Sequence, residues 1–152
     1  MAPTLIIGIG HLDRGDDAAG RIVAARLRER APADVEIVET DGEAAKLLDL
    51  MEGRDRVIVV DACLSGGTPG AIHRLDANAG PLPRPMFAMS SHAIGLVESI
   101  ELARTLGTLP GHCHVLAIEA ERFDLGAGLS SPVAAAVEEV VERLALLALE
   151  PV

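Results

Sequence analysis

The chain has no tryptophan and no tyrosine, and two phenylalanines are its only aromatic residues among 152 positions. Trp and Tyr dominate many binding hot spots, so any protein partner is expected to contact aliphatic surface, backbone and charge instead. No apolar run reaches the ~18 residues that a membrane-spanning helix needs. The chain also does not open with a basic segment followed by an apolar one. We therefore expect a cytoplasmic protein.

Positive charge is scarce as well. Lysine and arginine number 13 against 23 aspartates and glutamates, which gives a formal net charge of −10. This excess of negative charge argues against nucleic acid and against an anionic membrane as partners. Cys63 and Cys113 are the only cysteines, and without an export signal they are expected to be buried thiols rather than a disulfide. A hydrophobic content of 49% predicts a single globular domain over residues 1–152.

Short β-branched runs alternate with amphipathic segments along the chain. Strands are predicted at residues 5–9, 35–39, 57–60 and 115–118, with 57–60 buried on both faces, and residues 71–75 suggest an antiparallel edge strand. Helices are predicted after a cap at Asp16 or Asp17, around residues 47–51, from a cap at Ser90 or Ser91 to Gly107, and from Pro132 onward. The prolines at 81, 83 and 85 predict a loop without regular structure. This βαβ rhythm predicts a three-layer α/β/α sandwich around a mostly parallel, twisted sheet.

The most informative stretch is residues 4–20, TLIIGIGHLDRGDDAAG. A β-branched run meets Gly8 and Gly10 and then the paired carboxylates Asp16 and Asp17, in a layout similar to a phosphate-binding loop. A phosphate loop presents backbone N–H groups and often a lysine, whereas this loop presents carboxylates, which suit a hard or borderline cation. A dinucleotide-binding fingerprint would need its third glycine at the position of Asp13. The loop is therefore predicted to bind a cation.

Two further residues are expected to join this loop. Ligands of open α/β sheets bind beyond the carboxyl ends of the strands, where the strand order reverses. Asp61 follows the apolar run 57–60, so it would face Asp17 at a solvent-facing rim if the first and third strands are neighbours. His92 lies at a predicted helix start, where the helix dipole favours a neutral, metal-binding imidazole. Two carboxylates and one imidazole would leave coordination positions open, as in a working metal site.

Simpler interpretations exist for each of these residues. Asp61 could cap a turn, and His92 could be a surface or capping residue. Cys63 could act as a nucleophile with His92 as its base, although no third group to orient them is evident.

The remaining histidines of the chain are weaker candidates. His112 and His114 would share one face of a strand and could form a second metal site, but they are expected at the end of the sheet away from Asp61. His73 is expected to be an exposed residue of the edge strand.

Several motifs, in this order, resemble those of the nickel–iron hydrogenase maturation endopeptidases. They are Gly8-Ile9-Gly10, Arg14-Gly15-Asp16-Asp17-Ala18-Ala19-Gly20, Val59-Val60-Asp61-Ala62, Ser91-His92-Ala93-Ile94-Gly95-Leu96 and Gly126-Ala127-Gly128-Leu129-Ser130. The resemblance extends over nearly the whole chain and implies a five-stranded sheet. It also implies that Asp17, Asp61 and His92 occupy the catalytic and metal-binding positions of a metal-dependent peptidase with aspartic-type residues.

The resemblance further implies a substrate. Members of this family remove a C-terminal extension from the precursor of the hydrogenase large subunit after nickel has been inserted, and the nickel held by the precursor is what the three residues would recognise. Another divalent metal, such as zinc or cadmium, could occupy the same site in vitro.

The sequence departs from the family pattern in two places. His11 stands where many members have Asn, and it could support the site by adding a fourth ligand or by orienting the loop through hydrogen bonding. Asp16 could support the site as well. Asp41 and Gly42 lie in the segment associated with choosing the substrate, but the segment lacks the glycine- and threonine-rich pattern. Two alternatives from other classes remain, a non-catalytic metal- or partner-binding protein on the same fold and a small-molecule hydrolase or phosphorylase.

Overall fold

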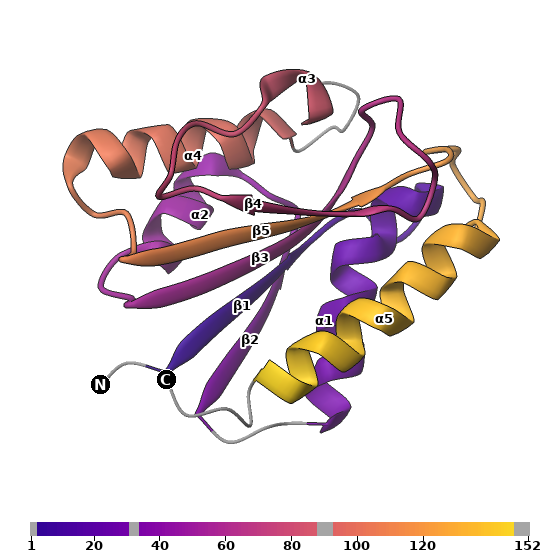
Figure 1. The fold of residues 1–152 in the computed structure, drawn as a ribbon, viewed down its shortest axis with the longest axis horizontal. Helices are drawn as coiled ribbons and strands as arrows, with labels where there is room; N and C mark the ends of the chain where they lie inside the picture. Colours follow the sequence, from indigo (N-terminus) through magenta and orange to yellow (C-terminus); the bar gives the residue numbers. More distant parts are fainter. Residues whose placement is uncertain (1–2, 31–33, 88–92, 148–152) are drawn as a thin grey trace.

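The computed structural model describes residues 3–30, 34–87 and 93–147 as a five-stranded sheet with helices on both faces (Figure 1). The strands are β1 Thr4–Ile9, β2 Val35–Thr40, β3 Arg56–Cys63, β4 Ile72–Asp76 and β5 His112–Glu119. The helices are the 3-10 turn η1 Gly15–Ala18, α1 Ala19–Arg30, α2 Ala44–Met51, α3 Arg84–Phe87, α4 Ala93–Leu106 and α5 Ser131–Leu147. The predicted three-layer α/β/α sandwich is confirmed.

The strand order is β2-β1-β3-β5-β4, with β4 antiparallel to β5 and every other pair parallel. The chain runs outward from β1 to β2 on one side and then crosses to β3 on the other. The order therefore reverses between β1 and β3, as the sequence led us to expect. Ligands of such sheets bind at the carboxyl ends of the strands on either side of that reversal.

Each face of the sheet has its own hydrophobic core, because strand side chains alternate between the faces. One core joins β1, β3 and β5 to α2, α3 and α4, and it includes Leu47, Met51, Phe87 and Ile100. The other joins the opposite strand faces to α1 and α5, and it includes Leu27, Val137 and Leu144. Figure 1 shows these two helix layers on opposite sides of the sheet.

Most strand and helix predictions agree with the structure, with differences at the ends. The antiparallel edge strand is confirmed as β4, and Gly107, with a φ of 75°, directly follows α4. β3 and β5 are longer than predicted, so Asp61 lies inside β3 and pairs in register with Ala117. The prediction that Asp16 or Asp17 caps α1 is wrong, because both residues lie within η1.

The proline-rich segment also differs from its prediction. Residues 84–87 form the single-turn helix α3, which buries Phe87. Proline is compatible with the first turn of a helix, where its missing N–H has no intrahelical partner in any case. Pro85 therefore permits this turn.

Both cysteines are buried free thiols, as predicted. In the part of the chain that the structure describes, no helix is long and apolar enough to span a membrane.

Candidate functional site

Close backbone packing between β1 and α1 brings the first loop to the carboxyl ends of β1 and β3. A Cβ added to Gly8 would lie 2.2 Å from the carbonyl oxygen of Gly20, and one added to Gly20 would lie 2.2 Å from that of Val60. Real Cβ atoms do not approach this closely, so only glycine fits at either position. The two glycines thus let η1, which carries Asp17, rest on the strands beside Asp61.

Asp17 is fully buried. Its Oδ2 lies 3.6 Å from Nη1 of Arg14, which is itself partly buried. The loop around it is closed by backbone hydrogen bonds, since the N–H of His11 donates to the carbonyl of Asp17 and the N–H of Asp17 donates to that of Arg14. A buried carboxylate needs compensating positive charge or hydrogen bonds. Arg14 supplies part of this compensating charge, a role that was not predicted from the sequence.

Asp61 is also fully buried, and its Oδ1 accepts a hydrogen bond of 2.8 Å from the N–H of Ala62. The expectation that Asp17 and Asp61 line a solvent-facing rim is therefore wrong. Both carboxylates lie beneath the surface because β3 continues past Asp61 to Cys63 and η1 packs against it. Such an environment strengthens the attraction of a carboxylate for a cation.

His92 lies outside the described residues, so its position relative to the carboxylates stays a prediction. The first described turn of α4 comes immediately after it, and this turn contacts the segment after β2. A Cβ added to Gly95 would lie 1.9 Å from the carbonyl oxygen of Gly42. The start of α4 is therefore packed against Gly42, one of the two residues predicted to bind the substrate. The N–H of Gly10 donates to the carbonyl of Thr40, which holds the same segment beside the first loop.

Asp16 points to a different part of the molecule. Its carboxylate accepts hydrogen bonds from the backbone N–H groups of Glu121, Arg122 and Ser130 and from the hydroxyl of Ser130, at 2.7 to 3.2 Å. These donors all lie between β5 and α5. Asp16 is thus a structural residue that fastens the first loop to the loop after β5, and His11 lies half-buried at the start of the same loop.

A polar cluster at the ends of β3, β4 and β5 was not predicted. At its centre is Glu119, which is fully buried. Its carboxylate accepts hydrogen bonds from the N–H of Ser65 at 2.7 Å, from the Ser65 hydroxyl, and from Nε2 of His73 at 3.0 Å. Burial acts to raise the pKa of Glu119, but the hydrogen bonds from Ser65 and His73 outweigh burial and hold the pKa below its ordinary value.

Cys63 and His73 belong to the same polar cluster, which affects the reactivity of the thiol and the exposure of the imidazole. Cys63 Sγ lies 3.9 Å from Glu119 Oε1, and burial together with the charges of Glu119 and Asp61 raises the thiol pKa to about 12. A buried thiol with so high a pKa is a poor nucleophile, which argues against the thiol mechanism. His73 lies on the edge strand as predicted, but its side chain is only 32% exposed.

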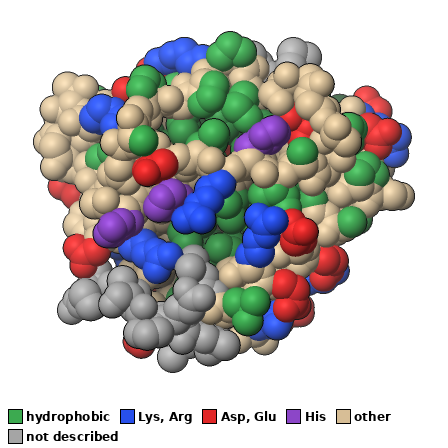
Figure 2. Space-filling model, viewed as in Figure 1, with side chains coloured by type: hydrophobic (Ala, Val, Ile, Leu, Met, Phe, Trp, Pro, Cys, Tyr) green, Lys and Arg blue, Asp and Glu red, His purple; other side chains and the backbone are tan. Residues whose placement is uncertain are grey.

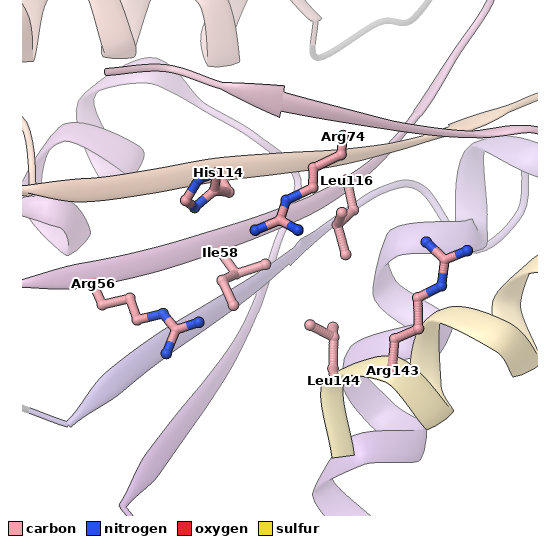
Figure 3. A pocket seen from close by; sticks show the side chains of 7 residues that line it. All are labelled: Arg56, Ile58, Arg74, His114, Leu116, Arg143 and Leu144. Carbon is pink, nitrogen blue, oxygen red and sulfur yellow. The ribbon is translucent and has the colours of Figure 1, made fainter. Parts of the chain in front are cut away.

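A hollow lies on the face of the sheet that packs against α5, toward the amino ends of β3 and β5 and away from Asp61 and Glu119. Arg56, Arg74, Arg143 and His114 surround an apolar floor formed by Ile58, Leu116 and Leu144 (Figure 3). Cationic and apolar side chains gather over this face in Figure 2. Burial lowers the pKa of His114, and Arg74 and Arg56 lower it further against the opposing effect of Asp76. Three guanidinium groups make this a poor place for a metal ion, and among the described residues neither His112 nor His114 belongs to a group of three potential ligands.

Comparison with known proteins agrees with this arrangement. Residues 21–146 match the family model described as hydrogenase maturation protease. The hydrogenase 2 maturation protease of Escherichia coli is 28% identical over 145 residues, which cover 92% of this chain and 87% of the relative. The hydrogenase expression/formation protein HupM of Azotobacter chroococcum is 30% identical over 148 residues, or 95% of this chain and 71% of the relative.

Solved structures give the same result. The hydrogenase maturating endopeptidase HybD from E. coli superposes with a TM-score of 0.78 at 26% identity and covers 93% of this chain, with 89% of its own chain matched. The fold, the order of the motifs and the sequence matches therefore lead to one conclusion: the chain belongs to the hydrogenase maturation protease family.

Proposed function

We propose that this peptidase removes the C-terminal extension of the precursor of a nickel–iron hydrogenase large subunit after nickel has been inserted. In this proposal Asp17, Asp61 and His92 recognise the nickel that the precursor carries. The observation that supports it most is the placement of two fully buried carboxylates at the carboxyl ends of β1 and β3, where the strand order reverses.

The donor set suits such a cation. Carboxylate oxygens and a neutral imidazole bind borderline divalent metals, and three protein ligands leave positions for groups of the precursor. The metal is part of the substrate here, so cleavage is tied to the arrival of a loaded precursor. Zinc or cadmium would be accepted by the same donors in vitro.

The cut itself needs a water molecule to add to the scissile carbonyl carbon, the C–N bond to break, and a proton to reach the departing amine. The precursor's cation can polarise the carbonyl or the water. A carboxylate such as Asp61, held rigidly by the N–H of Ala62, can accept the proton from the water and pass it on. Neither route needs a cysteine or serine nucleophile.

Substrate choice is assigned to the segment after β2. Gly42 lies next to the first turn of α4, and Asp41 before it is exposed, so a peptide bound at this edge of the sheet would meet Asp41 close to the buried carboxylates. The side chain of Asp41 is tied to its own loop through the N–H of Glu43.

The test is co-expression of the chain with candidate large-subunit precursors, with and without nickel, followed by intact-mass measurement of the precursor. Loss of a short C-terminal peptide is expected only with nickel present. Asp17→Asn, Asp61→Asn and His92→Ala should each abolish this mass change, whereas Asp49→Asn, at an exposed position of α2, should not.

Because Asp17 and Asp61 are buried, thermal unfolding of each variant must show that it is folded before its activity is compared. Normal processing by all three folded variants would contradict the site assignment. Stable association without any mass change would favour the non-catalytic binding protein, and turnover of a free small substrate would favour the small-molecule hydrolase.

A further inference from the structure

Three potential metal ligands converge where the carboxyl ends of β3 and β5 meet the amino end of β4. They are Cys63 at the end of β3, His73 on β4 and Glu119 at the end of β5, and one ligand atom from each lies within 4.8 Å of the other two. The strand register places Cys63 directly opposite Glu119. Among the described residues, this is the single group of His, Cys, Asp and Glu side chains that meets this condition.

The separations fit tetrahedral coordination. Bonds of about 2.0 to 2.3 Å from zinc to nitrogen, oxygen and sulfur place neighbouring ligand atoms about 3.3 to 3.6 Å apart. Here, Nε2 of His73 is 3.0 Å and Sγ of Cys63 is 3.9 Å from Oε1 of Glu119. Each of these two pairs needs to shift by less than about 0.5 Å to match, and the third pair, from Cys63 and His73, lies within 4.8 Å.

The burial of the three residues also suits a bound metal ion. Cys63 and Glu119 are fully buried, so two of the three ligands are held by packing. The His73 side chain is 32% exposed, which gives an ion a route inward from the edge strand. The backbone closes over the carboxylate at Gly67, where an added Cβ would lie 3.0 Å from Oε1 of Glu119.

Crowding around one oxygen is a further argument. Oε1 of Glu119 lies against the Ser65 hydroxyl, the imidazole of His73 and the thiol of Cys63. A carboxylate oxygen has two lone pairs for these three potential donors. A cation between the three strands would bind lone pairs of the Cys63 sulfur, the His73 nitrogen and the Glu119 oxygen. The thiol and the imidazole would then no longer compete as hydrogen-bond donors to that one oxygen.

From these observations we infer that Cys63, His73 and Glu119 form a binding site for a zinc-like divalent cation that belongs to this chain and is separate from the metal carried by the precursor. Thiolate sulfur, imidazole nitrogen and carboxylate oxygen are each ligand types that zinc binds. The fourth position is filled by water or by the hydroxyl of Ser65. On binding, the sulfur–metal bond forms and the thiol proton is released to solvent.

The site would fix the edge strand and the β3–β4 connection to the centre of the sheet. Cys63 is two residues from Asp61 along β3, so the bound cation also holds the strand end that carries the proposed catalytic carboxylate. Its role is to stabilise this region, and it needs no contact with the precursor.

Cobalt provides the sharpest test, because thiolate coordination to Co²⁺ produces a sulfur-to-metal charge-transfer band. Full-length protein treated with a chelator and titrated with Co²⁺ should develop this band at one equivalent, and added Zn²⁺ should remove it. The same titration should release protons and raise the melting temperature. Absence of the band in the wild-type protein would overturn the inference.

Variants assign the band to its ligands. Cys63→Ser should lose it, whereas Cys113→Ser, which removes the other buried thiol, should keep it. His73→Gln, at a half-exposed position, should keep the fold and weaken Co²⁺ binding at least tenfold. A band retained in Cys63→Ser, or unchanged affinity in His73→Gln, would refute the site.

The test is independent of the proposed protease site. Asp17→Asn and Asp61→Asn should retain the sulfur band while losing precursor processing. Loss of processing with no sulfur band would leave the protease proposal intact and remove this one. A sulfur band together with normal processing by the Asp17 and Asp61 variants would support the cation site and contradict the protease site.

Discussion

The carboxylate of Asp16 and the residue Ser130, 114 positions later, are joined by two hydrogen bonds. Oδ1 accepts from the backbone N–H of Ser130 at 2.7 Å, and Oδ2 accepts from its hydroxyl at 2.8 Å. Asp16 therefore connects the loop that carries Asp17 with the start of α5. Of the two adjacent aspartates, Asp16 is thus the one that ties distant segments of the fold together.

We predict that Asp16→Ala lowers the free energy of unfolding by about 3 kcal/mol or more, because it leaves buried backbone N–H groups without an acceptor. Ser130→Ala removes the hydroxyl donor alone and should cost about 1 kcal/mol. Urea denaturation measures both, and Asp13→Ala, at an exposed position of the same loop, is the control. Equal stability of the Asp16 and Asp13 variants would contradict the structural role.

A second prediction concerns the contact between α4 and the segment after β2. Alanine is normally the better residue inside a helix by about 1 kcal/mol, yet Gly95→Ala should destabilise the protein by about 1 to 3 kcal/mol. The added Cβ would collide with the carbonyl of Gly42. Thermal unfolding measures the effect. Gly80→Ala, where an added Cβ meets nothing within 4 Å, should be close to neutral, and a stabilised Gly95→Ala variant would show that the two segments are not packed as described.

A third prediction follows from the lowered pKa of His114. Burial, Arg74 and Arg56 lower the pKa of this imidazole in the folded protein below its ordinary value of 6.5. Below pH 6.5 the unfolded chain then binds a proton more readily than the folded one, so this residue makes stability fall as the pH drops. Above pH 6.5 both states are neutral and the effect vanishes.

Replacing His114 with Gln should reduce the loss of folding stability below pH 6.5. The measurement is the free energy of unfolding of the His114→Gln protein and of the wild type in urea, between about pH 7.5 and about pH 5. His112→Gln, at the exposed start of β5, is the comparison variant; it removes only the smallest of the charges that lower the pKa of His114, so its pH profile should stay closer to that of the wild type. An identical pH profile for His114→Gln and the wild type would contradict the assignment.

The sequence predicted what depends on local pattern. Hydrophobic runs located all five strands, and Gly107 marked the end of α4 because glycine readily adopts positive φ. Asp61 was expected to face the first loop if the first and third strands were neighbours, and the structure meets that condition because β1 pairs with β3. Glu119 follows the apolar residues 115–118 as Asp61 follows residues 57–60. The same reasoning, had it been applied to Glu119, would have found the centre of the second polar cluster.

What the sequence did not predict depends on contacts between distant segments. No local pattern shows that Asp16 accepts hydrogen bonds from residues 121 to 130, or that Gly95 touches Gly42. The burial of Asp17 and Asp61 was missed for a similar reason, since strand length past a polar residue is set by pairing with a neighbour. β3 extends to Cys63 because β5 offers partners as far as Glu119.

The strand order has a consequence for synthesis on the ribosome. β4 pairs only with β5, so the segment 72–76 leaves the ribosome without a partner until residues 112–119 follow. The donors that hold Asp16 emerge later still. The nascent chain therefore carries an unpaired strand through much of its translation and completes its N-terminal loop among the last events of folding. A product cut before Ser130 would contain the residues of all five strands but would lack two of the four donors that hold Asp16.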